Sequence, residues 1–298
     1  MSDFLLFSGT SNVPLAKQIA TRLHVSLGDV EITRFIDNEC RIFVRDDVAG
    51  KHVYVIESLS EVADQHLVEL CLLGQALKSL HAASVTAVIP WMGYSKQDKA
   101  FRKGEAVSAQ LVAKFIEIAG FNRVITCELH SENVVPYFHI PIVEVSTRKL
   151  LAGTLGNILG VVIAPDKGGV SRSERFAKEM HVPVVYLEKV RDLVSGSVSV
   201  TGISESVDGK NCIIFDDIIN TGATAIKTST FLKTHGAKKI SFLATHGVLA
   251  GNAAQQLRKS SIEEIILTDT IAIPKEKQFS EMKIVSVATL LADAIIQK

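Results

Sequence analysis

Short apolar runs that alternate with amphipathic stretches are the feature of this sequence that most limits its fold. The runs are long enough for buried strands and too short for buried helices. Helical patterns fall between many of them, for example over residues 66–80 and 107–120. Strand–helix alternation predicts an α/β fold with largely parallel sheets flanked by helices. The predicted strands are FLLFS (4–8), HVYVIES (52–58), VTAVIP (85–90), RVITCEL (123–129), GVVIAP (160–165), PVVYLE (183–188), NCIIFDD (211–217) and KISFLATH (239–246).

The order of these elements repeats along the chain. GKHVYVIESLS (50–60) resembles GKNCIIFDDII (209–219), and a predicted helix follows each segment. The next segments, HAASVTAVIP (81–90) and HGAKKISFLAT (235–245), also correspond. Identity is low, but order and spacing agree, so we predict two domains built on the same plan.

The length and composition agree with two domains. The chain has 298 residues, and a typical domain has about 150. Apolar residues make up 47% of the chain, enough to give each half its own core. We expect an N-terminal domain over residues 1–145 and a C-terminal domain over residues 146–285. The last helix, at about residues 286–298, is expected to pack on the first domain.

Charge and hydropathy exclude several classes of protein. The 32 basic and 32 acidic residues balance, which disfavours binding of nucleic acid through bulk charge. No apolar run approaches the ~18–20 residues of a membrane span, and the N-terminus lacks the basic start of a signal peptide. The cysteines have no metal-binding spacing and are expected to be buried, reduced thiols of a cytoplasmic protein: Cys40, Cys71, Cys127 and Cys212.

Two adjacent acids end one of the predicted strands. Asp216 and Asp217 precede NTGATA (220–225), a segment of small and hydroxyl residues that opens a predicted helix. Amides at a helix N-terminus favour phosphate, whereas carboxylates suit sugar hydroxyls or Mg²⁺. A phosphorylated sugar satisfies both groups. An ordinary turn capped by Asn220 or Thr221 would explain the turn but not the second acid.

The segment FDDIINTGATA (215–225) resembles the phosphoribosyl-pyrophosphate (PRPP) binding motif of phosphoribosyltransferases and PRPP synthases. Further segments resemble those of PRPP synthases (ribose-phosphate diphosphokinases) in the same order along almost the whole chain. The GEAVS and LEKVR segments and the modest length are most similar to the short, archaeal-type branch. The matching segments are RFIDNEC (34–40), IPWMGYSKQDKAFRKGEAVSA (89–109), CELHSENVVPYF (127–138), APDKGGVSRSERFA (164–177) and YLEKVR (186–191).

This resemblance implies an enzyme with two phosphoribosyltransferase-like domains. It would transfer the diphosphoryl group of ATP to the 1-hydroxyl of ribose 5-phosphate, giving PRPP and AMP, with Mg²⁺ as cofactor. Asp216 and Asp217 would bind the ribose hydroxyls. The residues that would hold the 5-phosphate are Asn220, Thr221, Gly222, Ala223 and Thr224.

The resemblance also implies a metal pair and catalytic cations. His130 and Asp166 would bind the metal, and Lys189 and Arg191, on a mobile loop, would act with His130 in catalysis. Each has a simpler interpretation from the residues alone. A lone histidine after a strand is often structural, an aspartate before Gly-Gly often makes a turn, and the two cations could lie on a solvated surface. The acids beside His130, Glu128 and Glu132, are expected to be solvated.

The nucleotide would be bound by two segments. Lys96 and Gln97 match an Arg-Gln pair of the family, and Phe35, Asp37 and Glu39 match an adenine-binding segment contributed by a neighbouring subunit. Residues 35–39 could equally form an edge strand or a hairpin. The shared site implies a dimer-based homo-oligomer, with tetramers and hexamers both open.

Three positions differ from the family pattern. Lys96 replaces arginine, Asn220 replaces aspartate and Ala223 replaces glycine. These differences keep one alternative in view, a non-catalytic homologue acting as a regulatory subunit. A phosphoribosyltransferase is disfavoured by the doubled plan and by the ELHSEN and LEKVR segments.

Overall fold

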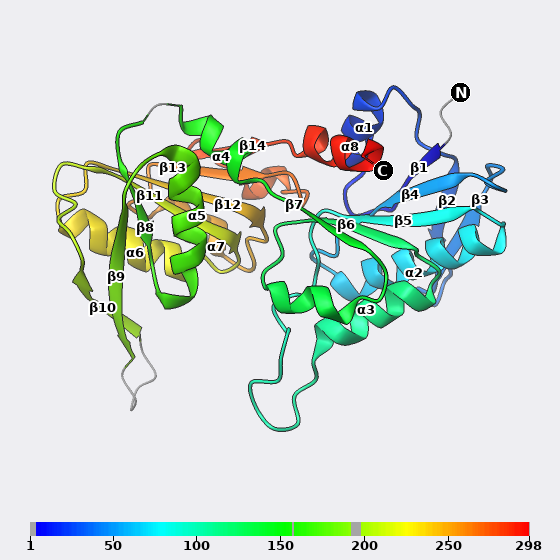
Figure 1. The fold of residues 1–298 in the computed structure, drawn as a ribbon, viewed down its shortest axis with the longest axis horizontal. Coiled ribbons are helices and arrows are strands. Elements are labelled where there is room, and N and C mark those ends of the chain that lie inside the picture. Colours follow the sequence, from blue (N-terminus) through cyan, green and yellow to red (C-terminus); the bar gives the residue numbers. More distant parts are fainter. Residues whose placement is uncertain (1–3, 157, 192–197, 298) are drawn as a thin grey trace. The chain divides into compact units, whose positions relative to one another are not determined.

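The chain folds into two compact units, each with its own sheet (Figure 1). The structure is a computed structural model and describes residues 4–156, 158–191 and 198–297. The N-terminal unit consists of residues 1–146, 270–272 and 286–298, and the C-terminal unit of residues 147–269 and 273–285.

The N-terminal unit is built on a five-stranded parallel sheet. A separate antiparallel hairpin, β2 (Val30–Arg34) and β3 (Cys40–Val44), follows the first helix. The strands in sheet order are β1 (Phe4–Ser8), β4 (His52–Ile56), β5 (Ser84–Ile89), β6 (Arg123–Cys127) and β7 (Ile142–Val145).

Helices cover both faces of this sheet. α2 (Ala63–Ser79) and α3 (Ser108–Ile118) lie on one face, where their leucines and isoleucines pack on alternate strand residues such as Val53 and Val55. α1 (Val13–Arg22) packs with α8 (Ala288–Ile296) on the other. The last helix is tied to the sheet because the Tyr54 hydroxyl donates to the Ile295 carbonyl at 3.1 Å. A short 3₁₀ helix, η1 (Glu132–Tyr137), follows β6.

The C-terminal unit has a seven-stranded sheet that is parallel except for its first strand pair. β10 runs antiparallel to β9, with a register shift between Val200 and Gly202. The strands in sheet order are β10 (Val198–Ile203), β9 (Val184–Arg191), β8 (Val161–Ala164), β11 (Asn211–Ile219), β12 (Lys239–Gly247), β13 (Glu264–Thr268) and β14 (Met282–Val285).

Alternation along β11 divides the core of this unit between two helix layers. Ile213 and Phe215 pack under α4 (Arg148–Leu155) and α5 (Val170–Met180), where Phe215 stacks on Phe176 at a centroid distance of 4.2 Å. Cys212 and Ile214 face the other layer. That layer contains α6 (Ala223–Thr234) and α7 (Ala253–Arg258). Short 3₁₀ helices precede α5 and β14, namely η2 (Lys167–Gly169) and η3 (Lys275–Lys277).

The two units repeat one order of elements. Strands β1, β4, β5, β6 and β7 occupy the same sheet order as β8, β11, β12, β13 and β14. In each unit a helix and a strand pair stand between the first two of these strands. The predicted α/β class with two similar, largely parallel units is therefore confirmed.

Two smaller expectations have different outcomes. In the described part of the chain, no helix has the length and apolar character needed to cross a bilayer. All four cysteines are free thiols, but only Cys127 and Cys212 are buried, so the expectation of burial is wrong for Cys40 and Cys71.

Candidate functional site

The acids of the predicted sugar site lie on β11, at the centre of the C-terminal sheet. The strand continues two residues beyond its predicted end and pairs with β12 as far as Ile219. Asp216 and Asp217 therefore lie near the end of the paired part of β11, close to the carboxyl edge at which parallel sheets bind ligands. Asp217 is buried, with 3% of its side chain exposed, and Asp216 is 22% exposed.

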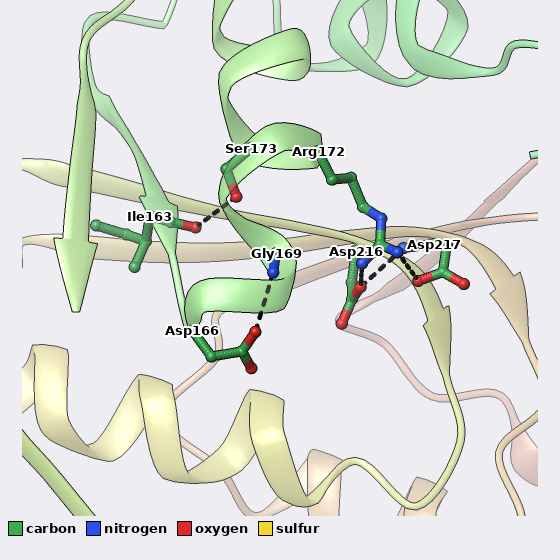
Figure 2. A network of polar contacts seen from close by, with 7 residues as sticks. All are labelled: Ile163, Asp166, Gly169, Arg172, Ser173, Asp216 and Asp217. Carbon is green, nitrogen blue, oxygen red and sulfur yellow. Dashed lines mark hydrogen bonds and ion pairs between the residues drawn. The ribbon is translucent and has the colours of Figure 1, made fainter. Parts of the chain in front are cut away.

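One guanidinium neutralises part of the charge of both acids. Arg172 Nη1 donates to Asp216 Oδ1, and Arg172 Nη2 lies 2.8 Å from Asp217 Oδ1 (Figure 2). The Asp217 amide also donates to Asp216 Oδ1 at 2.9 Å. Burial, followed by the charge of Asp217, raises the pKa of Asp216 to about 7, and Arg172 opposes this rise. The guanidinium therefore favours the ionised form of Asp216 against burial and the charge of Asp217.

The predicted phosphate cradle is the turn between β11 and α6. Gly222 lies in the left-handed region at φ 76°, and the first helical hydrogen bond runs from the Ile226 amide to the Gly222 carbonyl. The amides of the first helical turn precede that bond and have no partner within the helix. Thr221, Ala223 and Thr224 are exposed. The turn therefore presents exposed amides and hydroxyls of the kind that bind phosphate.

The segment 248–250 is hydrogen-bonded to the backbone just before this turn. The carbonyl of Ile219 accepts hydrogen bonds from the amides of Val248 and Leu249, at 3.0 and 3.1 Å. The carbonyl of Asn220 accepts from the Ala250 amide at 2.9 Å. These bonds fix the backbone direction at the end of β11, where the turn begins.

Asp166 follows β8, the strand beside β11. Its Oδ1 accepts a hydrogen bond from the Gly169 amide at 3.0 Å, which caps η2 just before α5 (Figure 2). This is the turn role that the residue type alone suggests. The turn nevertheless places Asp166 and the Asp216–Asp217 pair at the carboxyl ends of neighbouring strands of one sheet.

Three predicted site residues of the N-terminal unit lie on the segments that follow β5 and β6. Lys96 and Gln97 lie on a turn after β5, where Gln97 Oε1 accepts from the Ser108 hydroxyl at 2.6 Å. His130 is half-buried between β6 and η1.

Asp98 joins these two segments. Asn133 Nδ2 donates to its carboxylate at 2.9 Å, and the Tyr137 hydroxyl donates to its carbonyl at 2.7 Å. Burial opposes ionisation, but hydrogen bonds from Ser131 and Asn133 outweigh it and lower the pKa of Asp98. An ionised Asp98 therefore holds the Lys96–Gln97 turn against the segment that follows His130.

The expectation of solvated acids beside His130 is wrong for one of them. Glu128 is buried, accepts from the Ser146 hydroxyl at 2.8 Å, and has a positive φ of 28°. The connection after β7 covers this carboxylate. Glu132 is exposed, as expected.

The adenine-binding candidates lie on the turn of the β2–β3 hairpin, so the hairpin alternative describes their backbone correctly. The Phe35 amide donates to the Glu39 carbonyl at 2.9 Å, and Asn38 takes φ 71°. Half of Phe35 is exposed. Together with Ile36 and Asp37, Phe35 and Glu39 line an open surface depression.

The predicted catalytic cations lie partly outside the described residues. Lys189 and Arg191 belong to β9, where their backbones pair with Val200 and Val198 of β10. The side chains of residues 189–201 lie outside the described residues. Part of the predicted mobile loop is therefore strand, because Lys189 and Arg191 belong to β9.

The structure brings one group of predicted residues together in each unit. Asp166, the two β11 acids and the phosphate turn share the C-terminal unit, whereas Lys96, Gln97 and His130 belong to the N-terminal unit. The two predicted metal ligands thus come from different units. Among the described residues, no group of three or more histidines, cysteines, aspartates or glutamates could hold a metal ion.

Known proteins match this chain along its length. The family model for the N-terminal domain of ribose phosphate pyrophosphokinase matches residues 4–120. The model for the phosphoribosyl synthetase-associated domain matches residues 179–298. A ribose-phosphate pyrophosphokinase 1 of Listeria monocytogenes is 38% identical over 98% of this chain and 93% of its own length.

The chain belongs to the ribose-phosphate pyrophosphokinase family. A family protein of Caldanaerobacter subterraneus is 37% identical over 98% of this chain and 93% of its own length. The crystal structure of phosphoribosylpyrophosphate synthetase from Mycobacterium smegmatis matches with a TM-score of 0.92 and 34% identity, covering 98% of this chain and 97% of that one. The predicted family is therefore confirmed, while the resemblance to its archaeal-type branch stays a prediction.

One residue of this family member escaped the sequence analysis. Arg172 contacts both acids of the sugar site, yet in sequence it is one cation among several in SRSERFAK (171–178). Its position three residues after the Gly-Gly turn, in the same segment as Asp166, is the one signal that could have selected it.

Substitution of Gly222 by alanine is expected to destabilise the phosphate turn. An alanine at this left-handed position costs about 1–2 kcal/mol, and its Cβ would lie 3.2 Å from Leu257 Cγ. Urea unfolding of Gly222→Ala should therefore have a lower midpoint than that of the wild type. Gly153→Ala, within α4 and with no atom within 4 Å of the added Cβ, is the matched control. Equal midpoints for the two variants would contradict the assigned turn conformation.

Proposed function

We propose that the protein transfers the β,γ-diphosphoryl group of ATP to the 1-hydroxyl of ribose 5-phosphate, giving PRPP and AMP. The observation that carries this proposal is the similarity to ribose-phosphate pyrophosphokinases over 98% of the chain. In the reaction, the 1-hydroxyl oxygen bonds to the β-phosphorus and the bond between that phosphorus and the α,β-bridging oxygen breaks. AMP leaves with the bridging oxygen, and the hydroxyl proton passes to solvent.

The C-terminal unit is proposed to bind ribose 5-phosphate. Asp216 and Asp217 would accept hydrogen bonds from the ribose hydroxyls. The turn Asn220–Thr224, in which Thr221, Ala223 and Thr224 are exposed, would bind the 5-phosphate through its amides and threonine hydroxyls. Acids and phosphate turn follow one another on β11 and α6, an order that suits a sugar with a phosphate at one end.

The proposed metal is Mg²⁺, with His130 and Asp166 as its protein ligands. One oxygen of Asp166 accepts the hydrogen bond from the Gly169 amide, and its carboxylate still offers the hard oxygen donor that Mg²⁺ prefers. Mg²⁺ commonly binds through one or two carboxylates and the substrate phosphates, so a sparse set of protein ligands fits it. When bound, the ion would offset the negative charge that builds on the phosphoryl oxygens.

The nucleotide and transition-state contacts are proposed on the remaining residues. Lys96 and Gln97 would contact ATP, and Lys189 and Arg191 would stabilise the diphosphoryl group during transfer.

A neighbouring copy is proposed to contribute Phe35, Asp37 and Glu39 to the adenine site. Phe35 and Ile36 are exposed on the hairpin turn, which supports a role in contact with another molecule. The proposed enzyme is accordingly a homo-oligomer.

AMP formation tests the proposed function. Purified protein with ATP and Mg²⁺ should release AMP only when ribose 5-phosphate is present, with PRPP formed in equal amount. Chromatography of the nucleotides and of PRPP measures both products. Saturable binding of ribose 5-phosphate without AMP formation would favour the non-catalytic homologue instead.

His130→Ala tests the proposed role of this histidine. Turnover should fall by about 100-fold or more, a typical loss when one group that stabilises developing charge is removed. The affinity for ribose 5-phosphate, measured by calorimetry, should change little. His139→Ala, at an exposed histidine of the same unit, is the control. Turnover like that of the wild type in His130→Ala would remove the residue from the site.

A further inference from the structure

Arg172 links the segment that holds Asp166 to the two acids of β11, Asp216 and Asp217. It lies in the first turn of α5, directly after the turn that holds Asp166, and its side chain crosses to β11 (Figure 2). The same helical turn is fixed to the sheet because the Ser173 hydroxyl donates to the Ile163 carbonyl at 3.4 Å. Arg172 is 22% exposed, so its ion pairs are largely removed from solvent.

A guanidinium suits this position better than any other cation. Its planar group presents two nitrogens at once, and here each nitrogen contacts the Oδ1 atom of a different carboxylate. The like charges of Asp216 and Asp217 would otherwise repel each other. An ionised carboxylate has about four lone-pair sites, so each acid can still accept hydrogen bonds from a diol.

We propose that Arg172 is a positioning residue for ribose 5-phosphate: it orients both carboxylates toward the ribose hydroxyls and favours their ionised form. The proposal rests on the proposed function of the site. It assigns Arg172 no contact with the transferring phosphoryl group. The titratable and charged groups that determine the ionisation of Asp216 are Asp217 on the same strand and Arg172 on α5.

The sign of the pH effect follows from these contacts. Arg172 lowers the pKa of Asp216, which burial and Asp217 raise to about 7. Loss of the guanidinium removes the lowering influence, so Asp216 would take up a proton at a higher pH. If ribose 5-phosphate binds only when both acids are ionised, then on lowering the pH the variant must lose binding at a higher pH than the wild type does.

Arg172→Met and Arg172→Lys test the proposal, with Lys178→Met on the exposed face of α5 as control. In Arg172→Met, KM for ribose 5-phosphate should rise at least tenfold, while KM for ATP stays within twofold of the wild type. The acidic limb of kcat/KM should move up by about one pH unit or more, the usual effect of one neighbouring charge. Arg172→Lys keeps the charge but loses the planar pair of nitrogens. Its KM for ribose 5-phosphate and its acidic limb should therefore lie between those of the wild type and Arg172→Met.

Two results would overturn the proposal. A lower kcat at every pH, with unchanged KM for ribose 5-phosphate, would mean that Arg172 contacts the diphosphoryl group. Unchanged kinetics would mean that it is only structural. If the wild type releases no AMP, the proposed function fails on its own. Calorimetric titration with ribose 5-phosphate at several pH values then decides the role of Arg172, because positioning predicts weaker, pH-shifted binding in Arg172→Met.

A second, independent observation lies at the matching position of the N-terminal unit. β4 corresponds to β11 in sheet order, and Glu57 occupies the place in the repeat that Asp216 has in GKNCIIFDDII. Glu57 is fully buried, and Glu69 of α2 is 1% exposed. Neither forms an ion pair with lysine or arginine within the described residues. The two acids therefore need another means of neutralisation.

The hydrogen bonds indicate where a proton must be. Both oxygens of Glu69 accept from Thr10, from its amide at 2.6 Å and its hydroxyl at 2.9 Å. Glu57 Oε1 accepts from the Ser11 amide at 3.3 Å, while Glu57 Oε2 has no hydrogen-bond partner in the described structure. Both acids crowd Gly9: a Cβ there would lie 1.5 Å from Glu57 Oε2 and 2.9 Å from Glu69 Oε1.

We infer that Glu57 is a neutral carboxylic acid whose proton, on Oε2, lies beside ionised Glu69, and that the pair holds the Gly9–Ser11 loop over the end of β4. Burial, followed by the charge of Glu69, raises the pKa of Glu57 well above its usual value. The other titratable group nearby is Cys40 on β3, beside Arg34 of β2. The pair is thus a pH-dependent lock on the Gly9–Ser11 loop.

The contribution of the Glu57–Glu69 pair to the stability of the folded protein should fall as pH rises. A raised folded-state pKa contributes stability that is complete below the unfolded value of about 4.5 and is lost as pH rises through the folded value. Glu57→Gln keeps the shape and cannot ionise. Its urea midpoint should exceed that of the wild type by a margin that grows above pH 4.5, whereas Glu276→Gln, at an exposed site, should follow the wild type.

The infrared spectrum supplies a readout that needs no stable variant. Wild-type protein at pH 7 should show the carbonyl stretch of a protonated carboxylic acid. Asp216 is another candidate for such a band, so the assigned band must persist in Asp216→Asn and disappear in Glu57→Gln. Absence of the band from the wild type, or equal pH dependence of unfolding in wild type and Glu57→Gln, would overturn the inference.

Discussion

Burial of both faces of each parallel sheet is the constraint that decides where this chain can place polar groups. Helices cover the two sides, so residues inside the strands are mostly apolar, as Val53 in one unit and Ile213 in the other illustrate. Polar side chains can reach a ligand only where strands end. His130 follows β6, Asp166 follows β8, and the acid pair lies at the end of β11. The position of the site is thus a consequence of the topology.

Acids placed at a covered strand end require compensation, and the two units achieve it differently. In the C-terminal unit Arg172 supplies a permanent charge that contacts both carboxylates. In the N-terminal unit the neighbour of Glu57 is another acid, Glu69, which leaves a proton as the neutralising group. A guanidinium favours ionised acids that can accept hydrogen bonds from hydroxyls, whereas a bound proton makes one acid neutral. One fold position is therefore proposed to bind a ligand in one unit and to hold a loop in the other.

The parts that the sequence predicted are those in which neighbouring residues determine the structure. Strands such as β4 and β11 are short apolar runs, and the acids of β11 are adjacent in the chain. Arg172 could not be selected from its neighbours, because SRSERFAK reads as the polar side of an amphipathic helix. Its role depends on α5 crossing the end of β11. Glu128 was misjudged for the same reason, since Ser146 of a distant connection covers it.

The departures from the family pattern in the phosphate turn can be weighed on backbone geometry. The residue with positive φ is Gly222, whereas Ala223 begins α6 and is exposed, so its methyl group needs neither a left-handed backbone nor space in the core. Asn220 contributes its carbonyl to the bond with Ala250, a contact that any residue type can make. An amide side chain also repels phosphate less than a carboxylate does. The conformation of the turn therefore rests on Gly222 and on the 248–250 segment, which leaves positions 220 and 223 free to vary.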